Sequence, residues 1–162
     1  MKKAITFVLA VMLVMSMAVP TFATHTSPTA PVTSETATAA KPEVVEDAAN
    51  HGDIIIVLVA TNEAKKELTK EEQKTFAEAQ KALKEATPDG MKAQYFFFYT
   101  AKDKDGKRVT PPATLTVKIA NVTKVVVKEF VDGKWVELKA TLKDGNVVIE
   151  GLVEGPVAIF TK

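Results

Sequence analysis

The chain has 162 residues, with 21 Lys or Arg against 20 Asp or Glu, and its formal net charge at pH 7 is +1. This length suits one small domain with extensions. The balanced charge argues against a nucleic-acid-binding protein, which presents a basic face. The absence of Cys excludes disulfides, thiolate nucleophiles and Cys-based metal sites. The only histidines, His25 and His51, lie outside the predicted core, so a buried His base is not expected.

Residues 1–23, MKKAITFVLAVMLVMSMAVPTFA, have the three parts of a secretory signal peptide. Two lysines precede an apolar run, a Pro ends the run, and small residues occupy the cleavage-determining positions. A retained membrane anchor is the alternative, but the run is short for a hydrocarbon core of roughly 30 Å. We therefore expect a secreted or extracellular protein, associated with the membrane only through this segment before cleavage.

Residues 24–52 are rich in Thr, Ala, Pro and Ser and contain no aromatic residue. Such a segment buries too little apolar surface to offset the entropy lost on ordering. We expect a disordered linker that separates the domain from a surface, with a glycosylated stalk as the alternative.

The first strand and a helix are predicted at the start of the folded domain, residues 53–162. The β-branched apolar run DIIIVLVA at residues 53–60 is typical of a buried strand. Helix formers follow, and Thr69 with Glu72 forms a capping-box pattern that starts a helix near residues 70–86. Because this helix has few apolar positions, we expect it to pack at the rim of a larger core. Its apolar face consists of Phe76, Ala79 and Leu83.

The most aromatic segment, KAQYFFFYTA, predicts a strand at residues 92–101. Side chains alternate between the faces of a strand, so one face carries Tyr95, Phe97 and Tyr99 and the other carries two further Phe residues. The favoured interpretation is a central strand buried on both faces. The alternative is an exposed ligand-binding platform for a carbohydrate or a protein, because exposed aromatic patches mark contact sites. Trp135, which we expect to cap the core at a hairpin, is the fourth candidate for ligand contact.

The segment AKDKDGKRV places Asp103 and Asp105 before a Gly, in the order that a calcium loop uses. An EF-hand loop runs about twelve residues and ends on an acidic ligand. Here that position is Thr114, and the residues between supply no further carboxylate. Asp-Gly is also a strong hairpin-turn signal, and it recurs twice more between β-rich runs. The pattern favours three turns, and Asp103 and Asp105 remain only weak metal candidates.

Short strands separated by turns indicate an antiparallel β-sandwich, or a barrel, with one α-helix inserted after the first strand. The run ATLTVKIA alternates apolar and polar residues as a half-buried strand does. The two prolines before it, Pro111 and Pro112, mark a sheet edge or a crossing between sheets.

From Tyr95 onward the chain resembles immunoglobulin-like or ZU5-like β-sandwich modules of secreted and cell-surface proteins of Gram-positive bacteria. The matching segments are YTAKDKDGKRVTPPATLTVKI, KVVVKEFVDGKWVELKATLKDGNVVIEGL and the closing GPVAIF. The resemblance implies a hairpin with an edge strand, then a meander, then a terminal strand. It also implies a structural or adhesive role without catalytic residues. No sorting motif follows the last strand, so free secretion or non-covalent association is expected rather than covalent wall attachment.

The sequence therefore favours a secreted or cell-surface, non-enzymatic binding or structural module, with a cell-wall glycan or an extracellular protein as partner and no cofactor. One alternative is a small secreted hydrolase of cell-wall or host glycans, which requires two carboxylates across a cleft. No spacing selects such a pair among Asp53, Glu72, Asp103 and Glu137. A second alternative is a secreted inhibitor or effector acting through an exposed patch.

Overall fold

A computed structural model describes residues 41–45 and 52–162 of the chain. The predicted signal peptide, both histidines and most of the predicted linker lie outside the described residues. The elements in chain order are β1 (Glu43–Val44), β2 (Ile54–Val59), α3 (Ala64–Glu67), α4 (Lys70–Ala86), β3 (Lys92–Asp103), β4 (Arg108–Val109), β5 (Thr114–Lys118), β6 (Val125–Val131), β7 (Lys134–Lys143), β8 (Asn146–Glu150) and β9 (Gly155–Thr161).

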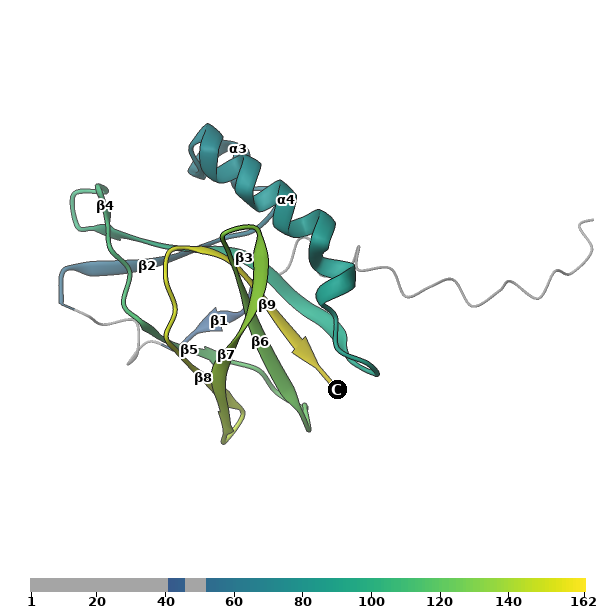
Figure 1. Cartoon of the computed structure of the whole chain (residues 1–162). Coiled ribbons are helices and arrows are strands. Elements are labelled where there is room, and N and C mark those ends of the chain that lie inside the picture. The colour runs from purple at the N-terminus through teal and green to yellow at the C-terminus, as the bar shows by residue number, and fades with distance from the viewer. Residues whose placement is uncertain (1–40, 46–51) are drawn as a thin grey trace, which may run out of the picture. The chain divides into compact units, whose positions relative to one another are not determined.

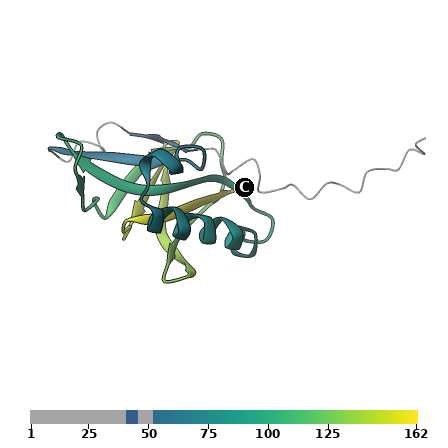
Figure 2. The same ribbon diagram turned by 90° about the horizontal axis from the view of Figure 1, so that it is seen from above.

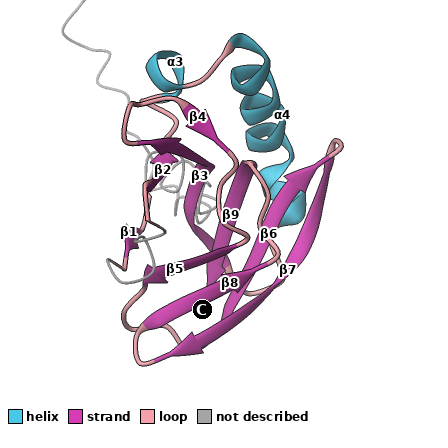
Figure 3. Ribbon diagram, turned by 90° about the vertical axis from the view of Figure 1, so that its left-hand side faces the viewer, coloured by secondary structure: helices cyan, strands magenta, loops and turns pink. Residues whose placement is uncertain are grey.

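In the described part of the chain, the strands form one antiparallel sheet in the order β1-β5-β8-β7-β6-β9-β3-β2, and β4 pairs with β3 (Figure 1). The sheet curls into a half-barrel, as Figure 3 shows from the side. The expected mainly β, antiparallel class is confirmed. The finer expectation, a sandwich of two stacked sheets, is not shown by this strand pairing. The reason is β7, whose first half pairs with β6 and whose second half pairs with β8, so that one strand carries the sheet around the curve.

Two apolar cores lie on opposite faces of the sheet. The concave core fills the half-barrel and contains Phe97 and Tyr99 of β3 with Val157 and Ile159 of β9. The outer core lies under the helices and contains, among others, Phe96 of β3. Alternate residues of β3 therefore enter different cores, as the period of a strand requires. The prediction that this aromatic strand is buried on both faces is confirmed.

Helix α4 begins and packs as its sequence directs. The Glu72 backbone N–H donates to the Thr69 hydroxyl at 3.3 Å, and the Thr69 backbone N–H donates to the Glu72 carboxylate at 2.7 Å, which completes the predicted capping box. Phe76, Ala79 and Leu83 are buried, as expected.

The expected position at the rim of the core is wrong, because α4 covers the outer face of the sheet and contacts β9 and β7 (Figure 2). Its ring contacts explain the difference. Phe76 stacks on Phe96 with 4.6 Å between ring centroids and meets Phe98 edge-on at 6.0 Å, so one large side chain replaces a longer apolar stripe. At the other end of α4, the Lys128 ammonium of β6 donates to the Ala86 carbonyl at 2.8 Å, where a cation complements the helix dipole.

Part of the predicted linker is structured. Residues 43–44 form β1 and pair with Lys118 and Val117 of β5. Val44 packs against the concave core, which gives this short apolar segment a place to bury its side chain. As a result, β5 has a neighbour on each side, β1 and β8, and it is not the edge strand that the resemblance implied.

All three Asp-Gly pairs are turns, as predicted, but they are of two kinds. Asp132-Gly133 and Asp144-Gly145 have positive φ at both residues, which is the type I′ geometry of a two-residue hairpin. At Asp105-Gly106 only the Gly has positive φ, and the loop is longer. It is closed by hydrogen bonds from the Gly106 N–H to the Asp103 carbonyl and from the Asp103 N–H to the Lys107 carbonyl.

We predict that Gly133→Ala and Gly145→Ala each lower the free energy of unfolding by about 1 kcal/mol, because a Cβ is strained at positive φ. An added Cβ meets no atom within 4 Å at either position, so the loss reports backbone strain alone. Urea denaturation measures it. Asn121 also has positive φ, and Asn121→Gly is the control, expected to leave stability unchanged or higher. A loss at Asn121→Gly equal to the other two would contradict the explanation.

Candidate functional site: an acidic groove beside an arginine cluster

The aromatic residues of the predicted platform lie inside the molecule. Phe97 and Tyr99 have 0% exposed surface and belong to the concave core, and Tyr95 is half-buried at its border. The Tyr99 hydroxyl donates to the Pro112 carbonyl at 2.7 Å, so even its polar atom is engaged. An exposed platform on these residues is therefore wrong for this structure, since no ligand on the surface can touch Phe97 or Tyr99.

Trp135 lies on the other face of the sheet, so the four candidate residues do not converge. Its ring packs on Phe130 and Phe96, with centroid distances of 5.3 and 6.2 Å. It is part of the border of the outer core, as the expected capping role requires. Its buried indole N–H has no hydrogen-bond partner among the described residues.

Asp103 serves the hairpin between β3 and β4. Its Oδ1 accepts the backbone N–H groups of Asp105 and Lys107 at 3.0 and 2.8 Å. An Asp side chain that bonds the backbone two residues on is a standard turn device. Within residues 41–45 and 52–162, no group of three or more His, Asp or Glu side chains is placed to hold a metal ion.

The four carboxylates considered for hydrolysis fall in three places, because Asp53 and Asp103 lie at the same end of the β2–β3 pair. Asp53 is exposed and precedes Ile54, the register partner of Asp103. Glu137 is exposed on β7, while Glu72 lies at the start of α4. Glu72 lines a concave surface.

That surface is a groove of about 360 Å³, which we call the acidic groove. It forms where the first turns of α4, the end of β6 with its following turn, and the segment entering β9 meet. Every ionisable residue lining it is acidic. The lining residues are Glu71, Glu72, Thr75, Phe98, Phe130, Val131, Asp132, Val153, Glu154, Gly155 and Pro156.

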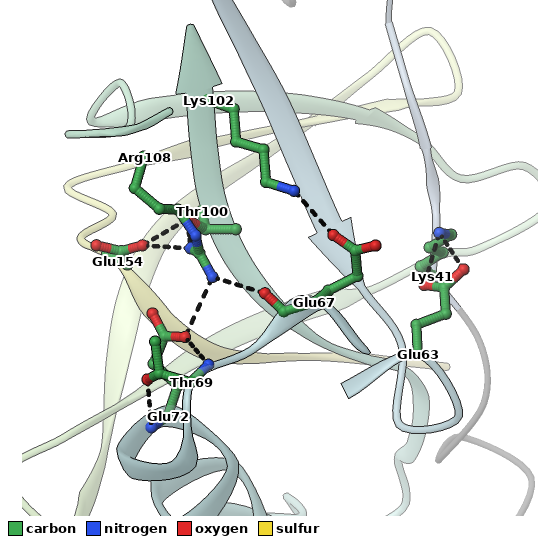
Figure 4. Close-up of polar contacts among 9 residues, drawn as sticks. All are labelled: Lys41, Glu63, Glu67, Thr69, Glu72, Thr100, Lys102, Arg108 and Glu154. Carbon is green, nitrogen blue, oxygen red and sulfur yellow. Dashed lines mark hydrogen bonds and ion pairs between the residues drawn. The ribbon is translucent and has the colours of Figure 1, made fainter. Parts of the chain in front are cut away.

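Next to the groove, Arg108 of β4 is the centre of a polar cluster (Figure 4). Its guanidinium donates to the Glu72 carboxylate at 3.1 Å, to the Glu154 carboxylate at 2.6 Å and to the Glu67 backbone carbonyl at 3.1 Å. It also contacts the Thr100 hydroxyl, which in turn donates to Glu154. The planar guanidinium with five donors can reach these acceptors together, which an ammonium cannot do. Arg108 therefore fixes two walls of the groove, α4 and the segment before β9.

A buried residue inside the half-barrel also holds the groove wall that contains Val153. Glu129 of β6 is 2% exposed, and its Oε1 accepts the Val153 backbone N–H at 2.9 Å. The neighbouring Leu152 is buried and donates its backbone N–H to the Ala113 carbonyl at 3.0 Å. These bonds hold the segment before β9 so that Val153 points outward with 51% of its surface exposed.

Burial governs the titration of this interior. It raises the pKa of Glu129 because the charged carboxylate loses its hydration, and the bond from Val153 opposes the rise only in part. Burial also raises the pKa of Tyr99 to about 12, with a smaller contribution from the negative charge of Glu129.

Sequence reasoning missed Arg108, Glu129 and the Val153–Glu154 segment. One signal was present, because Arg108 is the only arginine in a chain with twenty lysines. A lone Arg among lysines indicates a position where branched hydrogen bonding is needed. No comparable signal in the sequence distinguished Glu129, because a Glu is a common residue at a polar position of a strand.

Comparison with protein families, curated proteins and solved structures finds no match to this chain. Across the described ranges, no helix has the length and apolar character needed to cross a membrane.

We predict that Glu129→Gln raises the free energy of unfolding at neutral pH. The amide keeps an acceptor for Val153 and removes the cost of a buried charge. Since the folded-state pKa of Glu129 lies above its unfolded value, the folded state holds the proton more tightly. The wild-type protein therefore loses stability as pH rises from the unfolded towards the folded pKa. The advantage of the variant should shrink as pH falls through that window, which thermal unfolding at several pH values measures.

The control for that experiment is Glu137→Gln, at an exposed position of the adjacent strand, which is expected to change nothing. If the free energies of unfolding of Glu129→Gln and wild type differ by the same amount at all pH values, the buried charge is not the cause of the stabilisation.

We predict that Arg108→Lys lowers the free energy of unfolding by roughly 1–3 kcal/mol, because acceptors grouped around one guanidinium lose charge-assisted hydrogen bonds. Lys107→Ala, at an adjacent exposed side chain, is expected to stay within about 0.5 kcal/mol of wild type. Equal stability of wild type and Arg108→Lys in urea would show that the branched contacts are not needed.

Proposed function

We propose that the domain is a non-enzymatic binding module of a secreted or cell-surface protein, and that the acidic groove is its ligand-contact surface. The groove is the observation that carries the proposal. Its volume of about 360 Å³ is in the range of ligand sites, which are mostly apolar with a few placed polar groups. Its floor includes Phe98, Phe130 and Pro156, and Val153 adds exposed apolar surface beside them.

Two of the four carboxylates that line the groove, Glu72 and Glu154, have contacts that support a structural role over a catalytic one. Glycoside hydrolysis uses one carboxyl as acid and another as nucleophile or base, each free to exchange protons. In the groove, Glu72 and Glu154 are both engaged by Arg108, and Glu72 also closes the cap of α4. Their contacts are those of residues that hold the walls in place.

The sequence supplies the rest of the proposal. The pattern of residues 1–23 supports export, and the resemblance of the segment from Tyr95 onward supports a place among immunoglobulin-like or ZU5-like modules of Gram-positive surface proteins. A cell-wall glycan or an extracellular protein is the proposed kind of partner.

The test is a binding screen read by NMR on the ¹⁵N-labelled chain, with cell-wall oligosaccharides and extracellular-matrix peptides as probes. We expect a binding probe to shift the backbone amides of Thr75, Val153 and Glu154. Val153→Ser should weaken the shifts, because it removes aliphatic contact surface without changing the charge of the groove. Val136→Ser is the matched control, since Val136 is also an exposed apolar residue, at 48%, and does not line the groove.

Two outcomes would overturn the proposal. One is binding that shifts amides elsewhere and is unchanged by Val153→Ser. The other is turnover, seen as release of shortened products from an oligosaccharide during the titration, which would favour the hydrolase.

A further inference from the structure

Two carboxylates of the acidic groove carry unbalanced charge. Arg108 pairs with Glu72 and Glu154 from one side, so its single positive charge offsets one of these two negative charges. Glu71 and Asp132 form no ion pair within 4.0 Å with any residue in the described ranges, and both are exposed. They belong to different elements, the first turn of α4 and the turn between β6 and β7. The groove thus offers net negative charge from two of its walls.

The floor between these walls is apolar and tightly packed. Phe98 and Phe130 are 3% and 6% exposed, so neither ring is free to stack on a sugar face. Val153 and the half-buried Val131 supply aliphatic contact surface instead. Lysine and arginine combine an aliphatic stem with a charged head, and they place the stem on apolar surface while the head stays near water. Their shape and charge complement this groove.

Other ligand classes fit less well. A phosphate or carboxylate ligand would bring like charges together, which costs binding free energy. A neutral glycan would leave Glu71 and Asp132 without a charged partner and would lack an exposed ring for stacking.

From the charge and lining of the groove, we propose that it binds a cationic segment of another extracellular protein, in which Lys or Arg alternates with apolar side chains. The proposal rests on the groove being the ligand surface, and it names the partner chemistry. The apolar residues of the segment lie on Val153 and Val131, and the cationic heads lie at Glu71 and Asp132.

The experiment uses three probes in separate NMR titrations of the ¹⁵N-labelled chain: a short peptide of alternating leucine and lysine, the same peptide with glutamate in place of lysine, and a neutral chitooligosaccharide. We expect only the leucine–lysine peptide to shift the Thr75, Val153 and Glu154 amides. Its affinity should fall as salt rises, because exposed charges are screened.

Glu71→Gln combined with Asp132→Asn should weaken binding of the leucine–lysine peptide about fivefold or more, since each exposed ion pair contributes up to about 1 kcal/mol. Asn tolerates the positive φ of position 132, so the turn is kept. The matched control combines Glu85→Gln with Asp144→Asn. It also removes two negative charges, one from the same helix and one from a turn of the same type. Neither Glu85 nor Asp144 lines the groove. The control variant should leave the affinity unchanged.

Three other outcomes have a defined meaning. Equal weakening by the control variant would show that the total charge, and not the groove, attracts the peptide, and it would overturn the inference. Groove shifts with the chitooligosaccharide alone would overturn the inference and leave the proposed binding function intact. The absence of groove shifts with all three probes would contradict both.

Discussion

Burial of both faces of β3 and β9 is the constraint on which the rest of the structure depends. Each strand sends alternate side chains into the concave core and into the outer core. A sheet with two apolar faces needs cover on both, and here the curl of the sheet covers one while α4 covers the other. The position of α4 follows from this requirement, and so does the groove that forms beside its first turns.

The sequence predicted what depends on neighbouring residues. The cap at Thr69, the bounds of α4, the aromatic strand and the Asp-Gly turns all follow from local backbone and side-chain chemistry. It did not predict how far β7 extends. The local sequence is the same whether residues 134–143 form two short strands or one strand of ten residues. The observed strand pairs with β6 in its first half and with β8 in its second half. That distinction separates a sandwich from a curled half-barrel, and it is decided by pairing between distant segments.

The groove was also beyond local reasoning. Its residues come from segments near positions 71–75, 130–132 and 153–156 and from Phe98 of β3, which no spacing rule connects. The candidates chosen from the sequence were aromatic, because aromatic residues commonly form contact surfaces. In this protein the large rings are used to build the two cores, and the exposed features of the groove are a valine and unpaired carboxylates. The aromatic residues, which were the candidates for ligand contact, therefore serve mainly to pack the two cores.

The insertion of α3 and α4 between the adjacent strands β2 and β3 has a dynamic consequence. Because both ends of the insertion are anchored in strands that pair with each other, the helices can separate from the sheet without breaking any strand pairing. Besides the packing of its apolar face, α4 is held to the strands by one cation at each end, Arg108 through Glu72 and Lys128 through Ala86. The helical segment is thus suited to open as a separate cooperative unit below the free energy of global unfolding. Such an opening would bring Phe96 and Phe98 of β3 into contact with water and would remove one wall of the groove in the same event.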